Sequence, residues 1–237
     1  MVAVRLKSCN FAMKKKYRTI IDCEMKEYST YIFDLDGTLL NTLNDLAAST
    51  NYALRTMGFP ERTIEEVRRF VGNGVALLIR RAVPEGTAEE VTERTLSVFR
   101  AHYLDHGLDT TEPYDGIHEL LSELKRRGKN VAVVSNKFYD ATRQLCRHFF
   151  PDTVSVAIGE RKGIDKKPAP DTVVEALREL GVTADGAVYI GDSDVDVMTA
   201  KNSGIPCISV LWGFRDKDFL IQSGAREFAE KPEDILY

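Results

Sequence analysis

The chain has 237 residues, of which 43% are hydrophobic and 29% are charged, and its formal net charge is −4 at pH 7. This composition is typical of a globular protein with one large domain, or with a core and a smaller insert. The acidic balance excludes a nucleic-acid binder that depends on a broad basic surface, but it permits a local phosphate site.

Residues 1–25 are interpreted as an N-terminal extension of uncertain status. The basic stretch at Lys14–Lys16 is not followed by a long apolar segment, so no secretory signal is expected. Either translation starts at Met25 or the extension is peripheral. No run of about 18 apolar residues predicts a membrane span. The four cysteines are scattered without paired spacing, which indicates free thiols and a cytoplasmic protein.

The first predicted strand ends at an acidic turn. Three apolar residues precede Asp34, and Gly37 permits a sharp turn directly after it. The pattern then becomes helical up to about residue 108. The expected helices cover residues 44–57, a segment opened by a capping box of Thr63 and Glu66, residues 74–83, and a segment opened by a second capping box of Thr87 and Glu90.

Beyond residue 114, strands and helices alternate. The expected helices are 117–127, 140–149, 171–180 and 195–202, and the expected strands are 130–136, 154–158, 187–192 and 206–211. This alternation predicts an α/β fold, a doubly wound parallel sheet of the Rossmann-like kind with helices on both faces. We therefore expect a core of residues 26–43 and 114–237, interrupted by a helical insert of residues 44–113.

Polar side chains follow four of the predicted strands. They are Asp34 and Asp36 after the first, Ser135 and Asn136 after the second, Lys167 in the loop after the third, and Asp192 and Asp196 after the fourth. In a parallel sheet these strand ends meet at one edge, where ligands bind. Carboxylates suit Mg²⁺, and a hydroxyl and a lysine suit phosphate oxygens. The pattern indicates phosphoryl transfer, which depends on positioning and charge neutralisation.

From roughly Thr30 to the C-terminus, this arrangement resembles the phosphatase branch of the haloacid dehalogenase superfamily. Its DxDGT motif is present as residues 34–38, and its strand-end Ser or Thr as Ser135. Its lysine is assigned to Lys167 rather than Lys166, because Lys167 directly precedes a proline. Its GDxxxD motif is present as residues 191–196.

The resemblance implies a role for each matching residue. Asp34 is the expected nucleophile, which forms an aspartyl-phosphate. Asp36 is expected to protonate the leaving alcohol and then to activate water. Ser135 and Lys167 are expected to bind the transferring phosphoryl group. Further expected substrate contacts are Gly37, Thr38 and Asn136.

The resemblance also implies a Mg²⁺ site. The expected metal-binding residues are Asp34, Asp36 through its backbone carbonyl, Asp192, and Asp196 either through a water molecule or as a neighbour of the ligands. Asp194 lies between two motif positions, and we interpret it as a solvated charge at a helix N-terminus.

The insert is expected to form a cap over the active site. Gly72, Asn73 and Gly74 resemble the substrate-contacting loop of phosphoglycolate phosphatases, and Arg80 on the next helix is a further expected substrate contact. The segment from Trp212 to Arg215 also recurs in that group. Its alternative interpretation is structural, with Trp212 at the edge of the core and Arg215 in solvent.

We therefore expect a Mg²⁺-dependent phosphatase for a small phosphorylated metabolite, foremost 2-phosphoglycolate, acting as a monomer or homodimer without nucleic acid or membrane. Alternatives on the same fold are a β-phosphoglucomutase-like phosphomutase, a pyrophosphatase and a nucleotidase. A phosphonoacetaldehyde hydrolase is disfavoured, because it needs a lysine early in the cap and residues 44–57 contain none. An alternative of another class is a non-catalytic module that binds a phosphate ligand.

Overall fold

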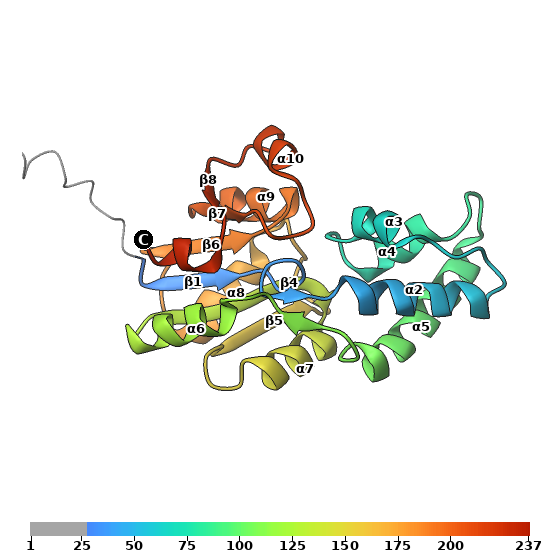
Figure 1. Cartoon of the computed structure of the whole chain (residues 1–237), viewed down its shortest axis with the longest axis horizontal. Helices are drawn as coiled ribbons and strands as arrows, with labels where there is room; N and C mark the ends of the chain where they lie inside the picture. Colours follow the sequence, from blue (N-terminus) through green and yellow to red (C-terminus); the bar gives the residue numbers. More distant parts are fainter. Residues whose placement is uncertain (1–27) are drawn as a thin grey trace, which may run out of the picture.

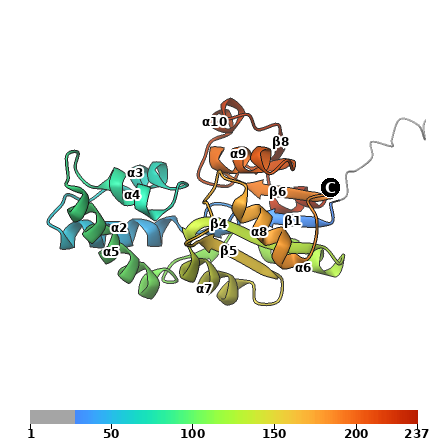
Figure 2. The same cartoon turned by 180° about the vertical axis from the view of Figure 1, so that it is seen from behind.

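The computed structural model describes residues 28–237, so the predicted extension of residues 1–25 lies outside the described residues. Figure 1 shows a sheet with flanking helices and, to one side of it, a separate cluster of helices. Figure 2 shows the same two parts from behind. No helix in the described part of the chain combines the length and apolar character that a membrane span requires.

The sheet has six parallel strands in the order β5-β4-β1-β6-β7-β8. Their bounds are β1 Thr30–Phe33, β4 Asn130–Phe138, β5 Val156–Glu160, β6 Ala187–Gly191, β7 Cys207–Val210 and β8 Glu227–Ala229. The strand order reverses next to β1, which pairs with β4 on one side and β6 on the other. This topology confirms the predicted doubly wound α/β fold.

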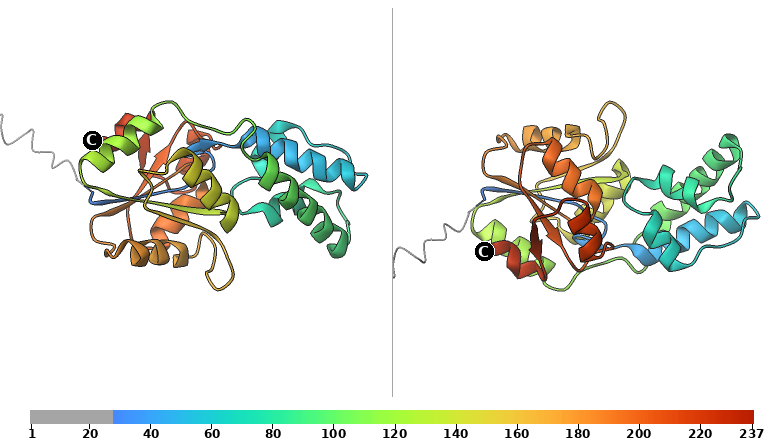
Figure 3. Two further views of the ribbon diagram at one scale, coloured as in Figure 1. Left: turned by 90° about the horizontal axis from the view of Figure 1, so that it is seen from below. Right: turned by 90° about the horizontal axis from the view of Figure 1, so that it is seen from above.

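Helices cover both faces of the sheet, as Figure 3 shows. The helices of this part are α6 Ile117–Arg126, α7 Tyr139–Phe149, α8 Asp171–Leu180, α9 Asp194–Asn202, α10 Lys217–Gln222 and the 3-10 helix η1 Pro232–Leu236. Alternate residues of β1 point to opposite faces, as strand geometry requires. Tyr31 and Phe33 pack with α6 and α7, whereas Ile32 packs with α8 and α9.

The four-helix cluster has a hydrophobic core of its own. Its helices are α2 Leu43–Thr56, α3 Ile64–Phe70, α4 Val75–Ala82 and α5 Glu89–His106. Leu54, Ile79 and Phe99 are fully buried between them. The short strands β2 Leu40–Asn41 and β3 Glu112–Pro113 pair antiparallel where the chain enters and leaves the cluster. The domain boundaries at residues 44 and 113 stay a prediction.

One of the two predicted capping boxes is present. Thr63 accepts a hydrogen bond from the Glu66 backbone N–H, and the Glu66 side chain accepts one from the Thr63 backbone. The box predicted at Thr87 is wrong, because the Thr87 hydroxyl donates to the Pro84 carbonyl at 2.6 Å and α5 begins after Ala88 without a side-chain cap. A local turn therefore competes successfully for this hydroxyl.

Candidate active site

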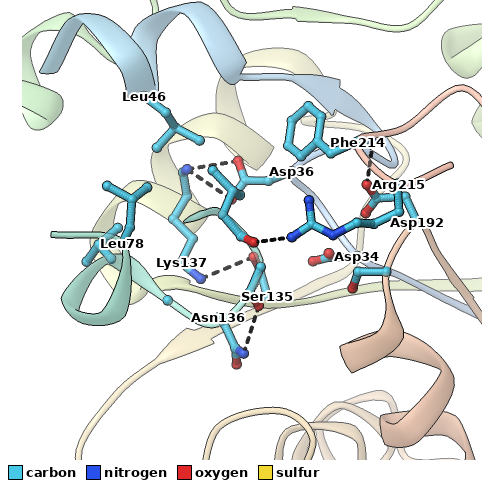
Figure 4. A pocket seen from close by; sticks show the side chains of 15 residues that line it. Asp34, Asp36, Leu46, Leu78, Ser135, Asn136, Lys137, Asp192, Phe214 and Arg215 are labelled. Carbon is cyan, nitrogen blue, oxygen red and sulfur yellow. Dashed lines mark hydrogen bonds and ion pairs between the residues drawn. The ribbon is translucent and has the colours of Figure 1, made fainter. Parts of the chain in front are cut away.

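A pocket lies where the carboxyl ends of β1, β4 and β6 face the helical cluster, and Figure 4 shows its side chains. The sheet side contributes acidic and polar residues, and the cluster contributes mostly apolar ones. The lining residues are Asp34, Asp36, Ser135, Asn136, Lys137, Asp192 and Ser193 from the sheet side, Leu46, Val71, Gly72, Gly74, Val75 and Leu78 from the cluster, and Phe214 and Arg215 after β7. The structure thus brings most of the sequence-predicted site residues together.

Lys167 lies buried between two carboxylates. Its Nζ is 2.9 Å from Asp34 Oδ1 and 2.7 Å from Asp196 Oδ1. Burial disfavours the charged lysine, but the charges of Asp196 and Asp34 outweigh this effect and raise the pKa of Lys167 well above its usual value. Lys166 lies outside this group, with its Nζ 3.4 Å from the Asn73 carbonyl. The structure therefore places Lys167, and not Lys166, beside Asp34.

Asp196 is held on both of its oxygens. Its Oδ1 accepts hydrogen bonds from Lys167 Nζ and from the Tyr189 hydroxyl, at 2.7 and 3.1 Å. Its Oδ2 accepts from the Ser193 backbone N–H at 3.1 Å and from the Ser193 hydroxyl at 2.6 Å, and this pair forms a capping box that opens α9. Asp196 is therefore fixed in place and in turn positions Lys167.

Three buried carboxylates converge at the base of the pocket. Asp34, Asp192 and Asp196 each offer an oxygen, and these oxygens lie within 4.8 Å of one another. Burial raises the pKa of Asp34 to about 7 against the opposing effect of Lys167, and burial together with Asp196 and Asp34 raises the pKa of Asp192 well above its usual range.

This carboxylate group fits a hard cation. Asp34 Oδ1 accepts no aligned hydrogen bond within the described residues, although Lys167 Nζ lies close to it. Buried like charges with an oxygen left without a donor are stabilised by a bound cation, and all-oxygen donors suit Mg²⁺. Gly37 is required beside this group, because its φ is +84° and a Cβ there would overlap the Asp192 carboxylate.

Asp36 is paired with a lysine that the sequence analysis missed. Lys137 Nζ donates to both carboxylate oxygens of Asp36, and the Thr42 hydroxyl donates to Asp36 Oδ1 at 2.7 Å. Lys137 Nζ also lies 4.5 Å from the centre of the Tyr103 ring. Burial opposes the charge on Lys137, but Asp36 and Tyr103 raise its pKa above the usual value. The sequence did offer one sign of this role, because Lys137 is a charged residue near the end of an otherwise apolar strand.

Ser135 and Asn136 lie at the rim of the sheet, as predicted. The Ser135 hydroxyl oxygen accepts a hydrogen bond from the Lys137 backbone N–H at 3.2 Å. The Asn136 side chain donates to the Lys167 carbonyl at 3.0 Å and to the Gly72 carbonyl at 3.3 Å. Asn136 therefore connects the lysine loop to the glycine-rich loop of the helical cluster.

Four residues predicted to bind substrate do not line this pocket, and one of them, Gly37, lies in the turn beside the Asp192 carboxylate. Arg80 is exposed and pairs with Glu89, because α4 buries its apolar face and turns Arg80 outward. Asn73 lines a neighbouring groove. Thr38 is buried in the turn after β1, and only its backbone reaches a partner near the site, accepting a hydrogen bond from Trp212 Nε1 at 3.0 Å. The substrate-binding role of Arg80 therefore stays a prediction, which its position outside the pocket does not support.

Arg215 is not left in solvent, as one interpretation of its segment expected. Its Nη1 and Nη2 donate to the carbonyls of Arg68 and Val71, at 2.9 and 2.6 Å. The side chain therefore bridges from the loop after β7 to the helical cluster, and it lines the pocket.

Comparisons with known proteins agree with this geometry. A family model described as haloacid dehalogenase-like hydrolase matches residues 31–210. A phosphoglycolate phosphatase of Aquifex aeolicus is 32% identical over 184 residues, covering 77% of this chain and 84% of that protein. Phosphoglycolate phosphatase 1 of Pseudomonas aeruginosa is 35% identical over 196 residues, covering 77% and 69%. A crystal structure from Lactobacillus delbrueckii subsp. bulgaricus has a TM-score of 0.83 at 36% identity, covering 88% of this chain and 97% of that one.

Proposed function

This chain belongs to the haloacid dehalogenase-like hydrolase family and is a phosphatase, and we propose that it hydrolyses 2-phosphoglycolate in a Mg²⁺-dependent reaction through an aspartyl-phosphate. The observation that carries the proposal is the buried Asp34 beside Lys167, at the base of a pocket that also holds Asp36 and Asp192. The two phosphoglycolate phosphatases described above support the choice of substrate.

Asp34, Asp192 and the backbone carbonyl of Asp36 would hold the Mg²⁺ ion, and Asp196 would orient the site around it. When bound, the ion would keep Asp34 ionised and offset negative charge on the phosphoryl oxygens. The buried carboxylates with raised pKa values support this assignment, because a cation relieves their mutual repulsion.

The protein groups suit a two-step transfer. An Asp34 oxygen attacks phosphorus, the bond from phosphorus to the substrate oxygen breaks, and Asp36 donates a proton to the leaving alcohol. Asp36 then takes a proton from water, whose oxygen attacks the aspartyl-phosphate, and this step releases phosphate and restores Asp34. Ser135 and Lys167 bind the phosphoryl oxygens throughout and offset their charge.

We further propose that residues 44–113 act as a cap on a core of residues 26–43 and 114–237. Gly72 and Gly74 line the pocket opposite the carboxylates, which supports a role of this loop in substrate contact. A closed cap would exclude bulk water from the reacting groups.

The remaining proposals concern setting and assembly. Cys146 and Cys207 form no disulfide, and burial raises the pKa of each thiol to about 12, which favours the protonated thiol. Unpaired thiols support the proposal of a cytoplasmic protein. A monomer or homodimer stays a prediction.

The test is phosphate release from 2-phosphoglycolate, sugar phosphates, pyrophosphate and nucleotides, with Mg²⁺ and with a chelator. We expect a Mg²⁺-dependent preference for 2-phosphoglycolate that Asp34→Asn abolishes. The matched control is Asp194→Asn, which removes a carboxylate from the first turn of α9 outside the pocket and should leave turnover unchanged. Turnover of another panel member would refute the substrate, and transfer between sugar hydroxyls would indicate a mutase.

A further inference from the structure

Arg215 is the one cation of the pocket lining that forms no ion pair with a carboxylate of the described residues, although its charge also acts on the nearby Asp192 carboxylate. The other cation of the lining, Lys137, is paired with Asp36, and Lys167 beneath it is shared by Asp34 and Asp196. The hydrogen bonds of the Arg215 guanidinium go to backbone carbonyls instead, those of Arg68 and Val71. A guanidinium keeps its charge at any working pH, so a partly buried one without an ion-pair partner favours an anion.

The guanidinium lies at the cluster side of the pocket. A Cβ at Gly72 would be 3.6 Å from Arg215 Nη2, so this group lies against the glycine-rich loop. Figure 4 shows the Arg215 side chain reaching into the pocket from the side of Asp192. The charge therefore lies within the same pocket as Asp34. Asp34 lies on the sheet side of this pocket, whereas the guanidinium lies next to the helical cluster.

Arg215 has donors to spare for an anion. A guanidinium has five N–H donors in a planar fork that matches a carboxylate. The bonds to the Arg68 and Val71 carbonyls use one N–H on each terminal nitrogen. The remaining N–H groups can therefore bind a carboxylate while the loop stays held.

These observations, taken with the proposed phosphatase reaction on which the inference rests, assign a second anion position. We propose that Arg215 is a specificity-determining residue that binds the carboxylate of the substrate, so that the enzyme selects short phosphomonoesters that carry a carboxylate. The phosphoryl end lies at Asp34, Ser135 and Lys167, and the carboxylate end lies at Arg215.

A merely structural role of Arg215 makes a different prediction. If the guanidinium served only to fasten the loop of the cluster, its loss would reduce turnover of every substrate alike. Arg81 supplies the matched control, because its Nη1 donates at 2.9 Å to the carbonyl of Phe70, the last residue of α3 directly before the same loop, while its side chain lies outside the pocket.

The experiment compares kcat/KM for 2-phosphoglycolate and for ethyl phosphate, which has the same carbon count but no carboxylate. Arg215→Gln should lower the value for 2-phosphoglycolate about 10- to 100-fold and change that for ethyl phosphate less than about threefold. Arg215→Lys should restore part of the preference, because it keeps the charge but not the fork. Arg81→Gln should leave the ratio of the two values unchanged.

Equal losses on both substrates, or an unchanged ratio in Arg215→Gln, would overturn the role of Arg215 and leave the phosphatase proposal standing. A wild-type enzyme that hydrolyses phosphomonoesters but prefers ethyl phosphate would also overturn it. A wild-type enzyme that hydrolyses neither compound would instead refute the proposed function and this inference with it. If Arg215→Gln does not fold, as judged by circular dichroism, the ratio measured with Arg215→Lys decides.

Discussion

Lys137 Nζ lies 2.8 Å from Asp36 Oδ1, and both side chains are withdrawn from solvent, with exposures of 1% and 13%. The lysine comes from β4 and the aspartate from the turn after β1, so this ion pair fixes the proposed acid–base residue to the sheet. Tyr103 of α5 contacts the same ammonium group, so the pair also joins the sheet to the helical cluster.

The first prediction concerns the removal of this lysine. Lys137→Met keeps the apolar stem but leaves Asp36 without its counter-charge. Breaking one side of a buried ion pair is strongly unfavourable, so we expect the free energy of unfolding to fall by about 3–5 kcal/mol and kcat to fall at least about tenfold. Denaturant unfolding and steady-state kinetics measure both effects.

Lys166→Met is the matched control, because Lys166 lies in the loop after β5 and, among residues 28–237, its side chain donates one hydrogen bond, to a backbone carbonyl. It should change the free energy of unfolding by less than about 0.5 kcal/mol. In a double-mutant cycle, Asp36→Asn should cost less when Lys137 is already Met. A Lys137→Met enzyme as stable as the wild type would contradict the importance of the pair.

The second prediction follows from the pKa of Asp34, which burial raises to about 7. An unfolded chain releases this proton near pH 3.9, so between about pH 4 and pH 7 the folded, metal-free protein holds a proton that the unfolded one does not. The stability of the metal-free protein therefore falls as pH rises through this window. Mg²⁺ binds the ionised carboxylate, so its stabilising effect should grow over the same window.

Thermal unfolding with Mg²⁺ and with a chelator, from about pH 5 to about pH 8, tests this prediction. The increase in Tm produced by Mg²⁺ should be larger at the alkaline end. Asp34→Asn should reduce both the increase and the downward slope of metal-free stability. An increase in Tm that is equal at both ends would show that Asp34 is ionised in the metal-free protein throughout.

Much of the core could be predicted from the sequence, because its strands are continuous apolar runs and its helices have clear periodicity and stops. The motif residues at the ends of β1, β4 and β6 met at one edge, since parallel topology leaves them no other arrangement. The strands β2, β3 and β8 were not predicted. β2 and β3 have two residues each and β8 three, and they form through pairing with distant segments rather than through local propensity.

The pairing of Lys137 could not be predicted, because its partner Asp36 lies 101 positions away in the sequence. A lysine that follows two polar residues, as Lys137 follows Ser135 and Asn136, indicates an exposed strand end. Only the fold shows that Lys137 is buried. The position of Arg80 outside the pocket could not be predicted for a similar reason. The helical pattern placed it near the glycine-rich loop in sequence, but only packing decides which side of α4 faces the pocket.

The third prediction concerns Asp45. This residue lies at the start of α2, where the chain enters the helical cluster, and it binds the segment by which the chain leaves the cluster. This buried carboxylate accepts hydrogen bonds from the backbone N–H and hydroxyl groups of Thr110 and Thr111, over 2.6 to 3.1 Å. Asp45→Ala leaves these donors without an acceptor, so the free energy of unfolding should fall by about 3 kcal/mol or more. Denaturant unfolding measures the loss.

Asp109→Ala is the control for Asp45, because Asp109 lies beside the same threonines and is exposed in an ion pair with His106. Its removal should change the free energy of unfolding by less than about 1 kcal/mol. Similar effects of the two substitutions would show that the hydrogen bonds of Asp45 to Thr110 and Thr111 do not stabilise the fold.

The last prediction concerns Gly213, which lies against the proposed metal site. A Cβ at this position would overlap the Asp192 side chain and lie 2.5 Å from the Gly37 carbonyl. Gly213→Ala must therefore displace Asp192 or the turn after β1, and we expect Mg²⁺ affinity to fall at least about tenfold, together with kcat/KM. Calorimetric titration of Mg²⁺ into the metal-free protein measures the affinity directly.

Gly86→Ala separates this effect from a general loss of stability. Gly86 has a φ of +80° with open space around it, so alanine there is strained by about 1 kcal/mol but touches nothing near the carboxylates. Gly86→Ala should lower Tm and leave the Mg²⁺ affinity unchanged. Gly213→Ala should reduce the Mg²⁺ affinity even if the two variants have the same Tm. Wild-type Mg²⁺ affinity in Gly213→Ala would contradict the proposal that Asp192 and the turn after β1 together hold the metal, because one of the two must be displaced.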